Sequence, residues 1–337
     1  MKRNLSIELV KFFFAISIAL GHFSSSILSG SLVVMLFFAL SGYFLVSSFD
    51  SGKYSGAWQF SFSRIRRIYP YYIFAFLVSF LLANTEFLLN PIRFFERLFL
   101  RLPEILLLQN VGIVDGGINY PLWQLCTLIV ASHIFFSLLE WNRSCTLNVI
   151  CPVLALCVFT YLSNVYNSGT PNEFGVIYHF IYVPLLRAAA GLSVGMFVHH
   201  PIKSILARLE RSSSTRLPAL VSLSSLVAIS AFIANRESYV AIIPFFMLIT
   251  CMLYSKGIYA RLFQLPILAR LDKLSLAVYL NHALIIRVIN KLSHVPSLAF
   301  IRSNAVYLPM LLVYSVIMLC VVDFLTARIK RGLLHKT

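Results

Sequence analysis

The chain has 337 residues, of which 59% are hydrophobic and only 12% are charged, and its mean hydropathy is +0.84. These values lie outside the range of a soluble globular domain and exclude water as the main solvent of the chain. The formal net charge of +16 would fit a nucleic-acid-binding protein, but the basic residues are spread over several loops between apolar runs. This distribution predicts contacts with anionic membrane lipids and no binding of nucleic acid.

Apolar runs of about 17 to 22 residues recur along the sequence, and each is long enough to cross the hydrocarbon core of a bilayer as an α-helix. The sequence therefore predicts an all-α membrane bundle of about ten transmembrane helices in a single domain, residues 1–337, with no fused soluble domain. The expected spans are 9–28, 31–49, 68–84, 121–140, 147–163, 178–198, 217–234, 239–254, 274–292 and 305–325. The stretch 98–111 is apolar but interrupted by charge and proline, which predicts an interfacial or re-entrant segment.

The positions of lysine and arginine test this arrangement, because cytoplasmic loops are enriched in positive charge. With an inside N-terminus, most of the 28 basic residues fall on the inner side. Both termini are therefore expected in the cytoplasm. The first apolar run is expected to remain uncleaved, since Glu8 and Lys11 interrupt it and another span follows at once. The six cysteines show no metal or redox spacing, and no metal site is expected.

Ionisable residues in the first span are costly in a bilayer and therefore indicate a functional site. Lys11 and His22 differ by a number of helical positions that returns to within about 20° of the same direction, so they lie on one stripe at two depths about 16 Å apart. Glu8 lies one turn before Lys11 and is expected to pair with it. His22 is expected toward the outer face, where a neutral imidazole can take a proton from a hydroxyl group. The alternative is a packing histidine that is hydrogen-bonded to a neighbouring helix.

Two further patterns precede the third span. FFALSG, residues 37–42, places Ser41 and Gly42 in the second span, where small residues allow helices to approach closely. Arg64 and Arg67 are three residues apart, so on a helix they share a face and can grip a phosphate together. This spacing fits a phosphorylated donor on the cytoplasmic side, and the alternative is a positive-inside anchor beside the tyrosines that follow.

Polar residues in the later spans need partners. Tyr279, Asn281 and His282 fall in the middle of a span and are candidate oxyanion donors. Arg187 lies inside the sixth span, where it can pair with a carboxylate or with an anionic donor. Trp123 is expected as an anchor at the membrane interface.

Taken in order, these segments resemble the acyltransferase family 3 membrane proteins, which include bacterial O-acetyltransferases that modify surface polysaccharides. The family's first helix carries a basic residue, ten intervening residues and a histidine, which here are Lys11 and His22. The FF-x-x-SG pattern reads FFALSG, and the R-x-x-R pattern reads Arg64 and Arg67. The C-terminal pattern of the family reads Ser275, Tyr279, Leu280 and His282.

The resemblance implies a ten-helix enzyme that binds acyl-CoA, usually acetyl-CoA, from the cytoplasm and delivers the acyl group to a hydroxyl acceptor at or beyond the outer face. It implies that His22 is catalytic and that Arg64 and Arg67 handle the donor. The sequence departs from the family at two positions. Lysine at position 11 replaces the usual arginine and loses the bidentate guanidinium fork, and Leu128 stands where the family often has a glutamate.

The resulting hypothesis is an O-acetyltransferase of the bacterial cytoplasmic (inner) membrane that uses acetyl-CoA as donor and a glycan, or its lipid-linked precursor, as acceptor. Candidate acceptors include the O-antigen of lipopolysaccharide and capsule. His22 is the expected base, and the expected binding residues are Lys11, Ser41, Arg64, Arg67, Arg187, Tyr279, Asn281 and His282. Two alternatives stay open: a proton-coupled exporter of a lipid or sugar, in which Lys11 and His22 form a relay, and a noncatalytic partner of a glycan-assembly complex.

Overall fold

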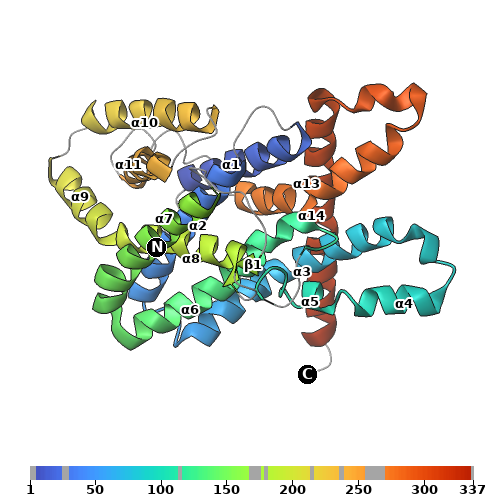
Figure 1. The fold of residues 1–337 in the computed structure, drawn as a ribbon, viewed down its shortest axis with the longest axis horizontal. Coiled ribbons are helices and arrows are strands. Elements are labelled where there is room, and N and C mark those ends of the chain that lie inside the picture. The colour runs from blue at the N-terminus through green and yellow to red at the C-terminus, as the bar shows by residue number, and fades with distance from the viewer. Residues whose placement is uncertain are drawn as a thin grey trace.

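The computed structural model describes residues 5–24, 30–112, 116–166, 176–177, 181–212, 216–234, 239–254 and 270–334. These residues form helices joined by short connections, with one small antiparallel pair of strands, β1 (Val176–Ile177) and β2 (Ile181–Tyr182) (Figure 1). The helices are α1 (Leu5–Phe23), α2 (Gly30–Asp50), α3 (Ala57–Ala83), α4 (Pro91–Phe99), α5 (Leu102–Ile105), α6 (Trp123–Cys145), α7 (Cys151–Tyr166), α8 (Val183–Phe197), α9 (His199–Ser212), α10 (Arg216–Ala234), α11 (Ile242–Leu253), α13 (Leu271–Leu292) and α14 (Asn304–Leu334). A 3₁₀ turn, η2 (Tyr120–Leu122), leads into α6, and a π-helical turn, η3 (Thr146–Ile150), joins α6 to α7.

Every expected span overlaps one of these helices. Four segments of the described chain are long and apolar enough to cross a membrane, namely Leu32–Asp50, Ala57–Ala83, Tyr120–Val165 and Asn304–Arg331. The helical membrane architecture is thus confirmed, whereas the number of spans and the side on which the termini lie stay predictions.

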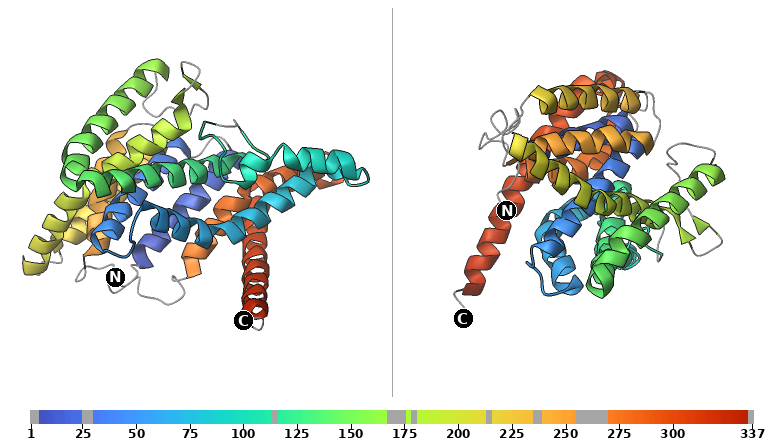
Figure 2. Two further views of the ribbon diagram at one scale, coloured as in Figure 1. Left: turned by 90° about the horizontal axis from the view of Figure 1, so that it is seen from below. Right: turned by 90° about the vertical axis from the view of Figure 1, so that its left-hand side faces the viewer.

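The surface of the outer helices is apolar, as a lipid environment requires. α10 exposes Leu217, Leu220 and Leu223, and α14 exposes Val313 and Phe324. Figure 2 shows the C-terminal part of α14 extending away from the other helices. Side chains of this kind on a soluble protein would form an aggregation-prone patch, whereas in a bilayer they contact hydrocarbon.

The centre of the bundle depends on close packing between α2 and α8. A Cβ atom at Gly42 would collide with the carbonyl of Leu192, and one at Gly195 would collide with the carbonyl of Ala39. Without side chains at these positions the two helix backbones approach until they touch, which maximises van der Waals contact where lipid supplies no hydrophobic driving force. Helix packing therefore explains the glycine of FFALSG, and Ser41 beside it is half-buried.

The segment expected to be interfacial or re-entrant, residues 98–111, contains the short helix α5 and begins at the end of another short helix, α4. α4 has nine residues and α5 has four, so neither is long enough to cross the hydrocarbon. Phe94 and Leu98 of α4 pack against Phe76 and Phe80 near the C-terminal end of α3. Figure 1 shows α4 running beside α3 at one edge of the molecule. α5 and the residues after it return the chain to the centre of the bundle.

His199, at the start of α9, forms a buried polar contact with α2. Its Nε2 lies 3.0 Å from Ser47 Oγ, its Nδ1 lies 4.0 Å from a carboxylate oxygen of Asp50, and its ring packs against Tyr43. Burial lowers the pKa of His199 from its ordinary value of 6.5 to about 4. The ring is therefore neutral at pH 7, where it can share one hydrogen bond with Ser47.

Acidification is expected to weaken this contact. Because the folded-state pKa lies below the unfolded value, the stabilisation is present above pH 6.5 and is lost as the pH falls toward 4, by an amount on the order of 1–3 kcal/mol. The measurement is the thermal unfolding midpoint in detergent between pH 7.5 and 4.5. His199→Gln keeps a neutral polar side chain and should have the shallower pH dependence, and parallel curves for the two proteins would contradict the assignment.

Candidate active site

The two polar residues of α1 face the same helix, α13. His22 stacks on His282, with ring centroids 5.2 Å apart and planes inclined by 21°, while Lys11 Nζ lies 3.9 Å from an oxygen of Asp272. The two contacts proceed in the same direction along both helices, so α1 and α13 run side by side and parallel. The stripe predicted from helical periodicity is therefore present, and it is the surface that α1 presents to α13.

His282 offers a hydrogen-bond acceptor beside His22. Its Nδ1 lies 2.7 Å from the carbonyl oxygen of Tyr279. A carbonyl only accepts, so Nδ1 carries the hydrogen, and in the neutral ring Nε2 is left with a lone pair. Nε2 is buried and has no hydrogen-bond partner among the described residues. In this tautomer His282 suits the binding of a hydroxyl hydrogen better than the role of an oxyanion donor.

Tyr120 completes the surroundings of His22. Its ring meets that of His22 edge to face, with centroids 5.3 Å apart. His22 itself is exposed at the end of α1, whereas His282 behind it is buried. The arrangement is thus an accessible imidazole with an aromatic ring at one side and a second imidazole at its back. The place of Tyr120 in this site is not predictable from the sequence, since no spacing rule connects η2 with α1 or α13.

α13 holds the 118–121 segment, which carries Tyr120, by three side-chain contacts. Arg287 Nη2 donates to the carbonyl of Ile118 at 2.7 Å, and Tyr279 donates its hydroxyl hydrogen to the carbonyl of Pro121. In the opposite direction, Asn119 Nδ2 donates to the carbonyl of Leu280 at 2.8 Å. Tyr279 therefore positions the segment, and its hydroxyl hydrogen is already used in the hydrogen bond to Pro121.

Glu104 of α5 holds the same segment from the other side. Its two carboxyl oxygens accept the backbone N–H groups of Ile118 and Asn119, both at 3.1 Å. Burial raises the pKa of Glu104 above its ordinary value, and the two N–H donors oppose that shift by stabilising the carboxylate. Tyr72 of α3 donates to the carbonyl of Glu104 at 2.6 Å and fixes α5 in turn. Glu104 was expected only as an interruption of an apolar stretch.

The side chains of Asn281 and Lys11 also have partners within the protein. Asn281 Nδ2 donates to the carbonyl of Ala277 in its own helix at 2.7 Å. Lys11 Nζ lies 3.4 Å from Glu8 as expected, and Asp272 is a second carboxylate nearby. The lysine therefore bridges α1 and α13 at the end of the stripe opposite His22.

Arg64 and Arg67 lie far from the histidine pair. Arg64 Nη1 donates to Ser132 Oγ of α6 at 2.8 Å and its guanidinium covers the ring of Phe60, whereas Arg67 is exposed. Arg287, close to the site of His22, approaches the carbonyl of Ser79, which follows Arg64 by about 22 Å along α3 at 1.5 Å per residue. The arginines and the histidines thus occupy opposite ends of α3.

Trp123 and Arg187 form a third location. The Arg187 guanidinium lies over the indole ring of Trp123, 5.2 Å from the ring centroid, and both residues are buried. Trp123 was expected as an anchor at the membrane interface, but its indole is buried in the protein, because α8 packs against the start of α6. Arg187 therefore joins α8 to α6.

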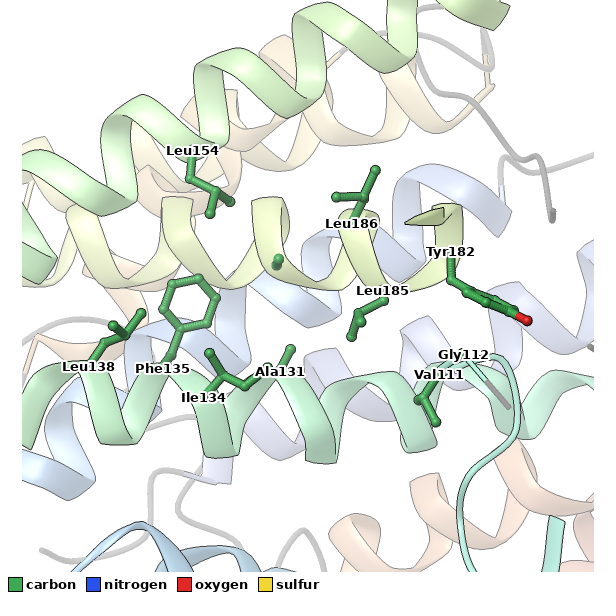
Figure 3. Close-up of a pocket in the computed structure, with 11 residues that line it drawn as sticks. Val111, Gly112, Ala131, Ile134, Phe135, Leu138, Leu154, Tyr182, Leu185 and Leu186 are labelled. Carbon is green, nitrogen blue, oxygen red and sulfur yellow. The ribbon is translucent and has the colours of Figure 1, made fainter. Parts of the chain in front are cut away.

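A cavity of about 350 Å³ lies between α6, α7 and α8 (Figure 3). Aliphatic and aromatic side chains, such as Ile134, Phe135 and Leu185, line it, and the hydroxyl of Tyr182 lies toward one end. None of the predicted site residues lines this cavity. Because its lining is almost wholly apolar, the cavity suits a hydrocarbon chain rather than a sugar or a nucleotide. In the described part of the chain, no group of three His, Cys, Asp or Glu side chains could hold a metal ion.

Apolar helices that fit a bilayer and an accessible histidine backed by a second one define a membrane protein with a site suited to proton transfer. The family model described as an acyltransferase domain matches residues 4–327, which is nearly the whole chain. The chain therefore belongs to acyltransferase family 3, and it is a membrane acyltransferase. No curated protein and no solved structure matches it.

Proposed function

We propose that the chain is an O-acetyltransferase of the bacterial inner membrane. It transfers the acetyl group of cytoplasmic acetyl-CoA to a hydroxyl of a cell-surface polysaccharide or of its lipid-linked precursor. The observation that carries this proposal is the stacked pair of His22 and His282, in which one imidazole is accessible and the other presents a buried acceptor nitrogen.

In the proposed reaction His22 acts as the general base. As the acceptor hydroxyl oxygen attacks the thioester carbonyl, its proton passes to the imidazole of His22. The carbon–sulfur bond then breaks, the new ester leaves, and the imidazolium returns the proton to the thiolate of coenzyme A. The proton balance closes in this direct transfer, in which the acetyl group passes from sulfur to the acceptor oxygen in one addition and elimination. Tyr279 and Arg287 hold the surrounding backbone during this step.

Arg64 and Arg67 are the proposed contacts for the phosphate groups of the donor. Charge-assisted hydrogen bonds to two guanidinium groups would bind these phosphates at the end of α3 remote from His22, and the extended pantetheine arm would reach along the bundle toward the histidines. Arg67 is exposed and Arg64 is half-buried, so a ligand at this face can meet both.

The double variant Arg64→Ala and Arg67→Ala is therefore expected to weaken acetyl-CoA binding at least tenfold, because each lost charge-assisted hydrogen bond is worth about 1.5–3 kcal/mol. Calorimetric titration of the detergent-solubilised protein measures the affinity. Arg66→Ala is the matched control, since Arg66 is an exposed neighbour on a different face of α3. Equal affinity in the wild type and the double variant would remove both arginines from the donor site.

The function itself is tested by comparing surface glycans from cells with and without the chain by mass spectrometry, together with release of free coenzyme A from membranes. An acetyl group that depends on the chain, and thiol release that depends on the glycan, are the expected results. Glycan export without consumption of acetyl-CoA would instead establish the transporter alternative.

A further inference from the structure

Tyr120 is an exposed ring in a buried segment. Its side chain is 40% exposed, whereas its neighbours Asn119, Pro121 and Leu122 are buried. The exposed ring stands beside His22, which is also exposed. A ligand at His22 can therefore also contact the ring of Tyr120.

Side-chain hydrogen bonds, in addition to packing, fix the backbone that carries this ring. Glu104 and Arg287 both place charged groups on it, and Gln109 Nε2 donates to the carbonyl of Tyr120 itself at 3.2 Å. A buried charge is costly unless it is paired or hydrogen-bonded. Glu104 and Arg287 satisfy this need with backbone groups of the 118–121 segment, and these bonds hold the segment in position.

Backbone geometry in the preceding residues leads to the same conclusion. Leu107 and Asn110 have φ values of 60° and 54°, a left-handed conformation that non-glycine residues rarely adopt. A side chain at Gly117 would collide with Gln109 and Glu104. Such strain persists only where the surrounding structure imposes it, and it concentrates at ligand sites. The backbone that carries Tyr120 is thus held in place by contacts with this preceding stretch and with α13.

We propose that Tyr120 is the platform on which the sugar ring of the acceptor packs, and this inference rests on the proposed function. An aromatic face attracts the C–H face of a sugar and leaves the hydroxyl groups free at the rim. A hydroxyl at the rim then lies within reach of the exposed imidazole of His22, whose ring meets that of Tyr120. The aromatic ring binds the acceptor, and His22, backed by His282, activates the hydroxyl.

Three variants test the platform with initial rates measured against two substrates, acetyl-CoA and non-acetylated glycan prepared from cells that lack the chain. Tyr120→Leu is expected to raise the KM for the glycan about tenfold and to leave the KM for acetyl-CoA unchanged, because it removes the aromatic face alone. Tyr120→Phe keeps the face and should match the wild type. Tyr120→Met replaces the leucine variant if that variant does not reach wild-type abundance in the membrane.

The control is Phe99→Leu on α4, which removes another exposed ring that makes no contact with His22 and should change neither KM. If the wild type acetylates the glycan and Tyr120→Leu shows an unchanged glycan KM, the platform is wrong and the proposed function stands. If the wild type releases no thiol with the glycan, the proposed function has failed, and the platform with it. An equal loss in Tyr120→Leu and Tyr120→Phe would overturn the platform in favour of a role for the hydroxyl group.

Discussion

His22→Ala is expected to lower acetyl transfer by about 10²- to 10⁴-fold, the range over which a positioned general base accelerates proton transfer. The substitution removes the accessible imidazole and leaves His282, whose Nδ1 is committed to the carbonyl of Tyr279 and whose Nε2 lies deeper in the bundle. The measurement is the rate of coenzyme A release with glycan present, at equal membrane abundance of the two proteins.

The matched control is His294→Ala, because His294 is an exposed histidine just beyond the end of α13 and contacts no site residue. Its rate should equal that of the wild type. The affinity for acetyl-CoA should be the same in all three proteins, since Arg64 and Arg67 lie at the other end of α3. Full activity in His22→Ala would refute the general-base assignment, and a loss of donor affinity would mean that the substitution acts through folding.

Helical periodicity was sufficient to predict the part of the site that lies on α1. Lys11 and His22 share a direction because an α-helix is regular, and the structure shows that this direction is toward α13. The pairing of Lys11 with Glu8 follows from the same regularity. Composition and span length predicted the helical membrane architecture for an equally general reason, namely the thickness of the bilayer.

The other half of the site was not predictable from sequence patterns. Tyr120, Glu104 and Arg287 come together through contacts between segments that lie far apart in the chain, and the residues between α5 and α6 follow no helical or strand period. The contact between Lys11 and Asp272 was not predictable for the same reason. Periodic patterns state which residues share a face, but they do not state which face of another element lies opposite.

Glu104→Ala is expected to destabilise the protein by about 2–6 kcal/mol, because it leaves two buried N–H groups without acceptors and each such loss costs about 1–3 kcal/mol. Glu104→Gln retains one acceptor oxygen and should fall between the alanine variant and the wild type. The unfolding midpoint in detergent measures the loss. Glu96→Ala on α4 is the control, since that glutamate is exposed and its removal should leave the midpoint unchanged.

The same substitution separates positioning from bulk stability. If Glu104 acts by holding the 118–121 segment, the glutamine variant should raise the glycan KM while the KM for acetyl-CoA stays constant at temperatures where the protein remains folded. An unchanged midpoint in Glu104→Ala would show that the 118–121 segment holds its position without the carboxylate. A proportional loss of affinity for both substrates would show a general loosening of the bundle. A selective effect on the glycan would connect a buried carboxylate on α5, through two backbone N–H groups, to the ring that faces His22.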